Sequence, residues 1–343
     1  CAFVLEQAAK EWVLDNVRHA LAQRRASLVG ELRRIGAGQR PPLGRFLDAM
    51  QWQPEQLYRT PKTDWSYTSL VREAGLLAAA DHDDKIARGF PSLLHVGDRL
   101  RLATWTAWLR AEAPPRLTGM PEHERRLAIM LLALVLGGEI GGLDSLAAGL
   151  RRLWRSGLRE ELLELLGVLE QRTEQLDLAL ELPLEGAPNI PLRVHARYTR
   201  DELLAACGEL WPGHDPRMQT GMRVVADDQL VLNLITIDKS QGYSPKTQYR
   251  DHAVSRTSFH SESPHTAGPD TPLGRRIIAR GEAGCVLLFV RARKDDERGV
   301  TNPYVFLGPT RLERHEGDRP MQLHWSLTHP IPAWFYPQTR LMA

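Results

Sequence analysis

The stretch LPLEGAPNIPLRVH, residues 182–195, marks the point at which the sequence changes from one pattern to another. Pro183, Pro188 and Pro191 lack a backbone donor and restrict the residues that precede them, so neither a helix nor a central strand is expected to run through this stretch. We therefore interpret it as a linker between two domains. The predicted segments are a helical domain over residues 1–182, a proline-rich linker over 183–196 and a β-rich domain over 197–343.

The part of the chain before the linker is rich in Leu, Ala, Arg and Glu, and its apolar residues recur at helical spacing. Residues 3–21, FVLEQAAKEWVLDNVRHAL, follow the 3.6-residue period of an amphipathic helix. Proline and glycine separate the further segments of this kind. Helices are predicted over residues 42–50, 54–58, 67–79, 98–112, 122–137, 143–155 and 160–176.

After the linker the pattern changes to short apolar strands. TRDELLAAC, residues 199–207, first predicts one helix, because Thr199 and Glu202 have the spacing of a capping box. In the last of the strands that follow, apolar and polar residues alternate. We expect a small curved sheet or barrel, so the predicted fold class is α+β, an all-α domain followed by a mostly-β domain. Strands are predicted over residues 228–238, 284–293, 303–309 and 321–327.

Composition excludes several classes of protein. The net charge is only +2, so any basic surface must come from the distribution of charge. Three distant cysteines without a CxxC pair indicate neither a zinc site nor a disulfide framework, which fits a reducing, cytoplasmic setting. The longest apolar run, residues 127–138, is shorter than the ~20 residues of a membrane span, and no signal peptide is apparent. Since the chain begins with Cys1, we expect a fragment or a processed product.

The motifs of common reaction classes are absent from the sequence. It contains no GxxxxGK[ST] phosphate loop, no GxGxxG fingerprint after a strand, no HExxH helix and no GxSxG elbow. These absences disfavour an enzyme, and we expect no catalytic residue, no metal and no cofactor in this chain.

The most unusual segment is KSQGYSPKTQYRDHAVSRTSFHSESPHTAGPDTPLGRRII, residues 239–278. It has little periodic apolar pattern, so we expect a long loop or irregular edge, and long ordered loops are usually functional. Cations and hydroxyls that hold phosphates interleave with aromatic residues that stack on bases, as a nucleic-acid surface requires, and a solvated polar loop is the alternative that composition leaves open. The expected phosphate-binding residues are Lys239, Ser244, Lys246, Thr247, Arg250, Arg256, Arg275 and Arg276.

This segment resembles a C-terminal domain that follows superfamily 2 helicase cores in many bacteria. The resemblance rests on YSPKTQYRDHAVSRTSFH, TPLGRR, LLFVRARK, PYVFLGP and GDRPMQLHWSLTHPIP, in the family's order and spacing. Proteins of this layout resemble modification-dependent (type IV) restriction enzymes of the SauUSI kind, in which a phospholipase D-like nuclease and a helicase motor precede a region that recognises methylated cytosine. The family has Trp after the Phe-His pair, where this chain has Ser261.

The resemblance implies that this chain is the target-recognition part of such an enzyme. Its expected partners are double-stranded DNA with 5-methyl- or 5-hydroxymethylcytosine and the upstream helicase and nuclease domains of the same polypeptide, with no membrane. Its β domain is expected to resemble the SRA or PUA-like folds that read modified bases.

Reading a modified cytosine requires a site that detects one methyl group, a difference of ~1–3 kcal/mol, and that compensates for a flipped base. Such a site needs an aromatic face, an acceptor for the cytosine amino group and an apolar niche. Tyr249 or Phe259 can supply the face, Asp251 the acceptor and Ala253 the niche. Core packing for the aromatic residues, and a turn cap or a pair with Arg256 for Asp251, are the structural alternatives. The expected base-binding residues are Tyr249, Asp251, Ala253, Ser255, Phe259 and His260.

Two competing hypotheses remain. One is a metal-dependent or His/Asp hydrolase centred on His260, since SFHSESPHTAGPD, residues 258–270, also holds Glu262, His265 and Asp270. The other is a protein-docking scaffold without DNA affinity, in which the helical half binds the missing motor.

Overall fold

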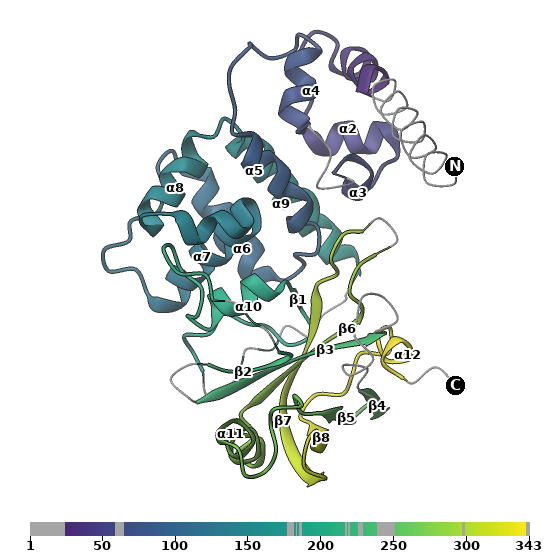
Figure 1. The fold of residues 1–343 in the computed structure, drawn as a ribbon. Coiled ribbons are helices and arrows are strands. Elements are labelled where there is room, and N and C mark those ends of the chain that lie inside the picture. Colours follow the sequence, from purple (N-terminus) through teal and green to yellow (C-terminus); the bar gives the residue numbers. More distant parts are fainter. Residues whose placement is uncertain are drawn as a thin grey trace, which may run out of the picture.

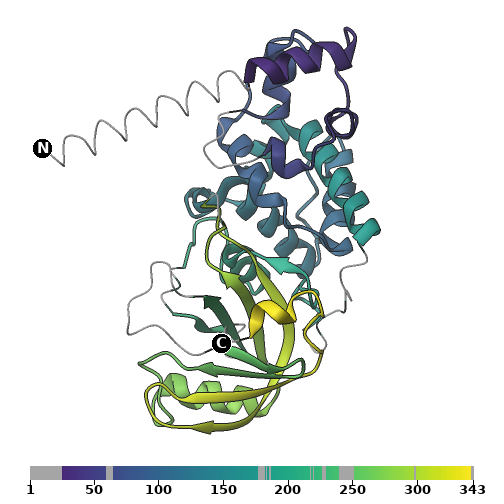
Figure 2. The same cartoon turned by 90° about the vertical axis from the view of Figure 1, so that its right-hand side faces the viewer.

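The computed structural model describes residues 25–58, 65–176, 182, 184, 187–216, 218, 220–225, 229–238, 251–296 and 299–340. Helices make up the first half of the chain and a mixed sheet most of the second (Figures 1 and 2), so the predicted α+β class is confirmed. In the described part, no helix has both the length and the apolar character needed to cross a membrane.

The helices predicted over residues 42–176 are present where the sequence places them, whereas the helix predicted over residues 3–21 lies outside the described residues. The one predicted over 67–79 is shorter, because Gly75 adopts φ +76° and ends the helix in a left-handed cap. Two 3₁₀ turns, η1 (Phe90–Leu93) and η2 (Gly137–Gly142), join neighbouring helices. The helices are α2 (Leu43–Met50), α3 (Pro54–Leu57), α4 (Tyr67–Glu73), α5 (Asp84–Gly89), α6 (Arg99–Arg110), α7 (Glu122–Leu136), α8 (Leu146–Arg155) and α9 (Arg159–Leu176).

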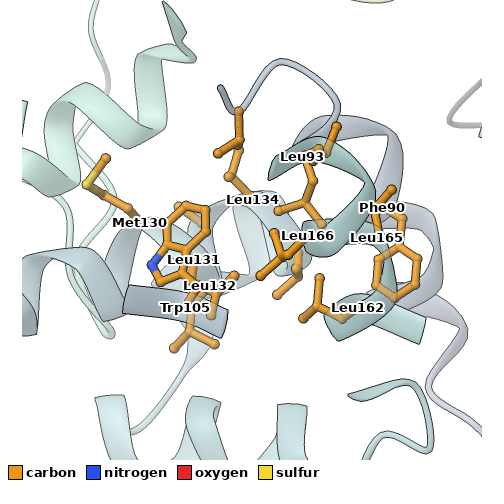
Figure 3. Close-up of a cluster of buried hydrophobic side chains, with 14 of the residues drawn as sticks. Phe90, Leu93, Trp105, Met130, Leu131, Leu132, Leu134, Leu162, Leu165 and Leu166 are labelled. Atoms are coloured by element: carbon orange, nitrogen blue, oxygen red, sulfur yellow. The ribbon is translucent and has the colours of Figure 1, made fainter. Parts of the chain in front are cut away.

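Helix α7 forms the centre of the helical half. Every residue from Leu127 to Leu136 is buried, as expected of a helix that is apolar on all sides. Figure 3 shows its leucines beside Trp105 of α6 and the leucines of α9. The Trp105 indole donates to the carbonyl of Leu127 (3.0 Å), so its one polar atom is satisfied inside the core.

The second half is built on a sheet with the strand order β2-β3-β6-β7-β8-β5-β4, and β1 pairs with β7. Only β3 and β6 run parallel among the pairs that the structure describes. The strands are β1 (Arg197–Tyr198), β2 (Met222–Val225), β3 (Leu230–Asp238), β4 (His252–Ser255), β5 (Ser258–Glu262), β6 (Val286–Arg293), β7 (Tyr304–Glu316) and β8 (Gln322–Leu327). Three helices accompany them, α10 (Arg200–Ala206), α11 (Pro272–Glu282) and α12 (Tyr336–Thr339).

The sheet curls strongly around its own core. Asn233 on β3 and Ser261 on β5 have three strands between them in the sheet, namely β6, β7 and β8, yet the Asn233 amide lies 3.4 Å from the Ser261 hydroxyl. Trp325 and Phe259 fill the space between these strands. Among the described residues β3 and β5 share no ladder, so the sheet is curved, as predicted, but stays open and does not close into a barrel.

The other face of the sheet shares a hydrophobic core with the helices. Phe289 and Phe306 stack with their ring centroids 4.5 Å apart and belong to the same cluster as α7 and α9. Leu192 and Val194, from the stretch predicted as a linker, are fully buried in this cluster. The start of the β-rich half therefore lies in one core with the helices.

The expectation of a long loop in the central segment is wrong where the structure describes it. Residues 252–262 form the hairpin of β4 and β5, and residues 272–282 form α11. The sequence does not predict the hairpin, because Ser261 is polar although its side chain points inward, so β5 lacks an alternating apolar pattern. Helix α11 carries an ordinary signal, since Thr271 caps the Gly274 amide (3.0 Å) and Pro272 occupies the first helical position.

Candidate functional site

A cavity of about 1160 Å³ opens where the curled sheet meets the helical half. Strands β3 and β6 and the start of β7 form one wall, and the residues around the ends of the β4–β5 hairpin form a second. Side chains from α9, η1 and the β1–α10 corner complete it. Because distant parts of the sequence meet there, a ligand in this cavity would contact both halves of the protein at once.

Asp251 is the expected base-binding residue that lines this cavity. Its carboxylate Oδ1 accepts the backbone N–H of Glu262 (2.9 Å), which ties the start of β4 to the end of β5. The residue is 5% exposed. Asn233 lines the same cavity from the opposite strand. An acceptor and an amide thus stand on facing walls, as recognition of a nucleobase edge requires.

Ala253 and Phe259 do not line the cavity. They are Cα partners across the β4–β5 pair, and Phe259 is in turn the partner of Trp325 on β8. Both side chains belong to the core of the curled sheet. This placement corrects the expectation of base contact and supports the alternative of core packing.

His260 lies on the outward face of the sheet, since its neighbours Phe259 and Ser261 point inward. It stands in a row with His252 (ring centroids 5.2 Å apart) and His324 (4.9 Å). Burial, together with Arg314 and His260, lowers the pKa of His324. The row lies on the outward face of β4, β5 and β8, where His260 itself is buried, and His260 is not among the residues that line the cavity.

Ser255 and Arg256 shape the turn between β4 and β5. The Ser255 hydroxyl accepts the N–H of Thr257 (3.1 Å), and the Arg256 Nε donates to the carbonyl of Ile331 (2.8 Å). These contacts give both residues a structural role. Asp251 does not form the expected pair with Arg256 in the described ion pairs; it holds the hairpin end instead.

Arg275 and Arg276 are exposed on α11, at the end of the sheet far from the helical half (Figure 1). The Arg275 Nη1 donates to the carbonyl of Asp270 (2.6 Å). Neither arginine lines the cavity. The remaining expected residues lie outside the described part of the chain, namely Lys239, Ser244, Lys246, Thr247, Tyr249 and Arg250.

The cavity also contains a buried arginine that the sequence analysis missed. Arg291, on β6, is 8% exposed and lines the wall. Its guanidinium lies 4.3 Å from the centroid of the Tyr304 ring. The signal was present in the alternation of β6, where Leu287, Phe289 and Arg291 share one face and only the last is charged.

A buried ionic network adjoins the cavity at the boundary of the two halves. Glu202 of α10 is fully buried and accepts from His95 Nε2 (2.7 Å) and from Arg101, which also pairs with Asp98. Burial alone would raise the pKa of Glu202, but His95 and Arg101 outweigh it and lower the pKa to about 2. His95 lines the cavity, so the network connects the cavity wall to α6.

The hydrolase residues do not come together in one place. Glu262 and His265 line the cavity, whereas His260 and Asp270 do not. Among the described residues, no group of three His, Cys, Asp or Glu side chains is placed to hold a metal ion. The geometry offers no nucleophile-base pair from this set.

A family model matches the second half of the chain. Residues 192–338 match the model of a family described as a domain of unknown function (DUF3427). No curated protein matches the chain. The match begins at the buried Leu192 and covers the whole sheet, so the cavity lies between the matched region and the helices that precede it.

Proposed function

We propose that this chain is a DNA-binding target-recognition module that reads 5-methyl- or 5-hydroxymethylcytosine in duplex DNA by flipping the base into the cavity. The observation that carries the proposal is the cavity itself, which opens beside the concave sheet and has a buried carboxylate, Asp251, in its wall. Small-molecule sites in proteins typically measure ~300–1,000 Å³, so the space suffices for a nucleoside and part of its backbone.

The wall offers the groups that cytosine requires. Asp251 accepts from the exocyclic amino group, which thymine lacks. Met222 and Ile235 are buried, apolar and part of the same lining, so they replace Ala253 as the neighbours expected for a methyl group. One methyl in an apolar niche supplies ~1–3 kcal/mol, which sets the scale of the preference for the modified base.

The cavity lining also supplies positive charge for the DNA backbone. The cations of the lining are Arg172, Arg197, Arg200, Arg291 and Lys294. Arg172 is paired with Glu55 and Arg200 with Asp201. These cations and the carboxylate of Asp251 match the division between phosphate contacts that position DNA and base contacts that specify it.

The shared core supports a role in a larger machine. The β-rich half is joined to the helices by a continuous cluster and by the Glu202 network, so binding in the cavity is mechanically linked to the helical half. We propose that the helical half passes this signal to upstream helicase and nuclease domains of the same polypeptide, as the resemblance of the sequence implies.

The test is a titration with duplexes that differ at one position, which carries cytosine, 5-methylcytosine, 5-hydroxymethylcytosine or a mispaired thymine, at several salt concentrations. We expect modified cytosine to bind about tenfold more tightly than cytosine. Asp251→Asn should remove the preference for 5-methylcytosine over thymine, because the amide no longer acts only as an acceptor.

Asp270→Asn is the matched control, since Asp270 is exposed and does not line the cavity. It should bind all four duplexes like the unchanged protein. Equal binding of cytosine and both modified cytosines at moderate salt would rule out the reading of modified bases.

A further inference from the structure

Among the described residues two arginines are buried, and their surroundings differ. Arg101 is fully buried and is neutralised by the carboxylates of Asp98 and Glu202. Arg291 is 8% exposed, and among the described residues it forms no ion pair. Burying a cation without a counter-charge costs free energy. The surroundings of Arg291 lack the anion that the surroundings of Arg101 have.

The neutral groups around Arg291 fix the orientation of its guanidinium. Nε donates to the Thr236 hydroxyl (2.9 Å) and Nη1 to the carbonyl of Asn302 (3.1 Å). The Tyr304 ring lies against its face, 4.3 Å from centroid to Cζ. Within the described part of the chain Nη2 has no hydrogen-bond partner. Thr236, Asn302 and Tyr304 all line the cavity, so the remaining donors face the space that a ligand would fill.

Other charges around the cavity favour an anion at this end. Lys294 also lines the wall and forms no ion pair with the described residues. Arg197, another lining residue, lies over the Trp334 ring (5.0 Å), and burial together with the nearby Arg172 lowers its pKa. Arg172 and Arg197 repel one another, and Lys294 adds a further positive charge to the same lining, so the cavity favours a ligand with negative charge.

We infer that Arg291 is a phosphate-binding residue inside the cavity, which holds the phosphodiester of the nucleotide whose base enters it. A guanidinium with a fixed plane presents a fork of N–H groups that matches two oxygens of one phosphate. The inference rests on the proposed function for the DNA, and it adds a phosphate site that is separate from Asp251. The shared chemistry is a nucleotide phosphate, which a free nucleotide also carries.

The first arm of the test combines a protein variant with a DNA variant. Arg291→Gln is compared with Arg293→Gln, which removes an exposed arginine from the same strand outside the cavity lining. Duplexes carry a neutral methylphosphonate at either phosphate that flanks the modified cytosine. We expect Arg291→Gln to weaken binding about tenfold and to reduce the slope of log K against log salt by about 1, with no such change for Arg293→Gln.

One methylphosphonate should weaken binding of the unchanged protein and leave binding of Arg291→Gln unaltered. If the methylphosphonate weakens both proteins equally, or if the two glutamine variants behave alike, the assignment is overturned. Arg291→Lys, which keeps the charge, should retain the salt slope with weaker affinity. If Arg291→Gln fails to fold, this loss of affinity without a change of slope supports the assignment, and unchanged affinity of Arg291→Lys contradicts it. Thermal unfolding of each variant shows whether it is folded.

The second arm separates this inference from the proposed function and uses monomers. Calorimetry compares 5-methyl-deoxycytidine monophosphate with the nucleoside that lacks the phosphate. If the unchanged protein binds the monophosphate more tightly than the nucleoside, and Arg291→Gln does not, the phosphate site is supported. This result holds even if duplexes with and without the modification bind alike. If the protein binds the monophosphate but no duplex, the ligand is a free nucleotide. No difference between monophosphate and nucleoside overturns the inference.

Discussion

His195 combines an unusual backbone conformation with a buried ring. Its φ is 70°, in the left-handed region, and its N–H donates to the carbonyl of Phe306 (2.6 Å). The ring lies 6.5 Å from that of His329, and among the described residues its Nε2 has no hydrogen-bond partner. Burial, with His329 and Arg256, lowers the pKa of His195 to about 4.

This shift predicts a loss of stability in mild acid. Because the pKa is lower in the folded state than its ordinary value of 6.5, the unfolded chain takes up the proton first. The stability due to neutral His195 is complete above pH 6.5 and is lost as the pH falls towards 4, by as much as ~3 kcal/mol. His195→Asn places a residue that tolerates the left-handed region at this position. The free energy of unfolding, measured with urea, should then depend less on pH between pH 6.5 and 4.

His214→Asn is the control, because His214 is exposed and stacks on Trp211 at the surface. Its unfolding free energy should depend on pH as in the unchanged protein. If His195→Asn keeps the full pH dependence, another group is responsible for it.

At the scale of elements, one hydroxyl holds the curled sheet in shape. Ser261 on β5 accepts the Trp325 indole N–H from β8 (2.8 Å) and lies 3.4 Å from the Asn233 amide of β3. All three side chains are buried. Position 261 is therefore an interior position, and a tryptophan placed there would not form an exposed stacking surface in this fold.

Ser261→Ala should destabilise the protein by about 1–3 kcal/mol, because the indole N–H and the Asn233 amide are left buried without their acceptor. Ser261→Trp should be at least as destabilising, because the space is already filled by Trp325. Ser326→Ala, next to Trp325 on the exposed side of β8, removes a similar hydroxyl and should change stability by less than about 0.5 kcal/mol. Urea unfolding measures all three, and equal effects at 261 and 326 would contradict this role.

The same elements show what the sequence reveals and what it hides. Helix α7 and its neighbours were predictable because apolar residues at helical spacing lie between prolines and glycines. The cavity was not, because its wall joins η1, α9, β3 and β6, which are distant in sequence and meet only through the fold. Asp251 stands out in the sequence as an acid within a basic, polar segment, and it lines the cavity. Arg291 does not stand out, because it lies in an apolar strand. Phe259 lies in the core, and the sequence does not distinguish an aromatic residue in a core strand from one that stacks on a base.

At the scale of the whole molecule, the helical half and the sheet should unfold together. Leu192, Phe289 and Phe306 belong to the same cluster as α7 and α9, so separating the halves would expose much of the core. A proline-rich linker between independent domains would instead allow two transitions. We expect native-state hydrogen exchange to give the same opening free energy for peptides of α7 and of β6.

Glu202→Gln tests this cooperativity from the boundary. Removing the carboxylate leaves the buried Arg101 with less counter-charge, which should destabilise the protein by about 3–5 kcal/mol. If the halves form one unit, the opening free energies of α7 and β6 fall together by this amount. Asp201→Asn, the neighbouring change of a carboxylate on a more exposed position, should lower neither by more than about 0.5 kcal/mol. A fall confined to β6 would show that the β-rich half unfolds alone, and recognition in the cavity would then lack a rigid path to the helices.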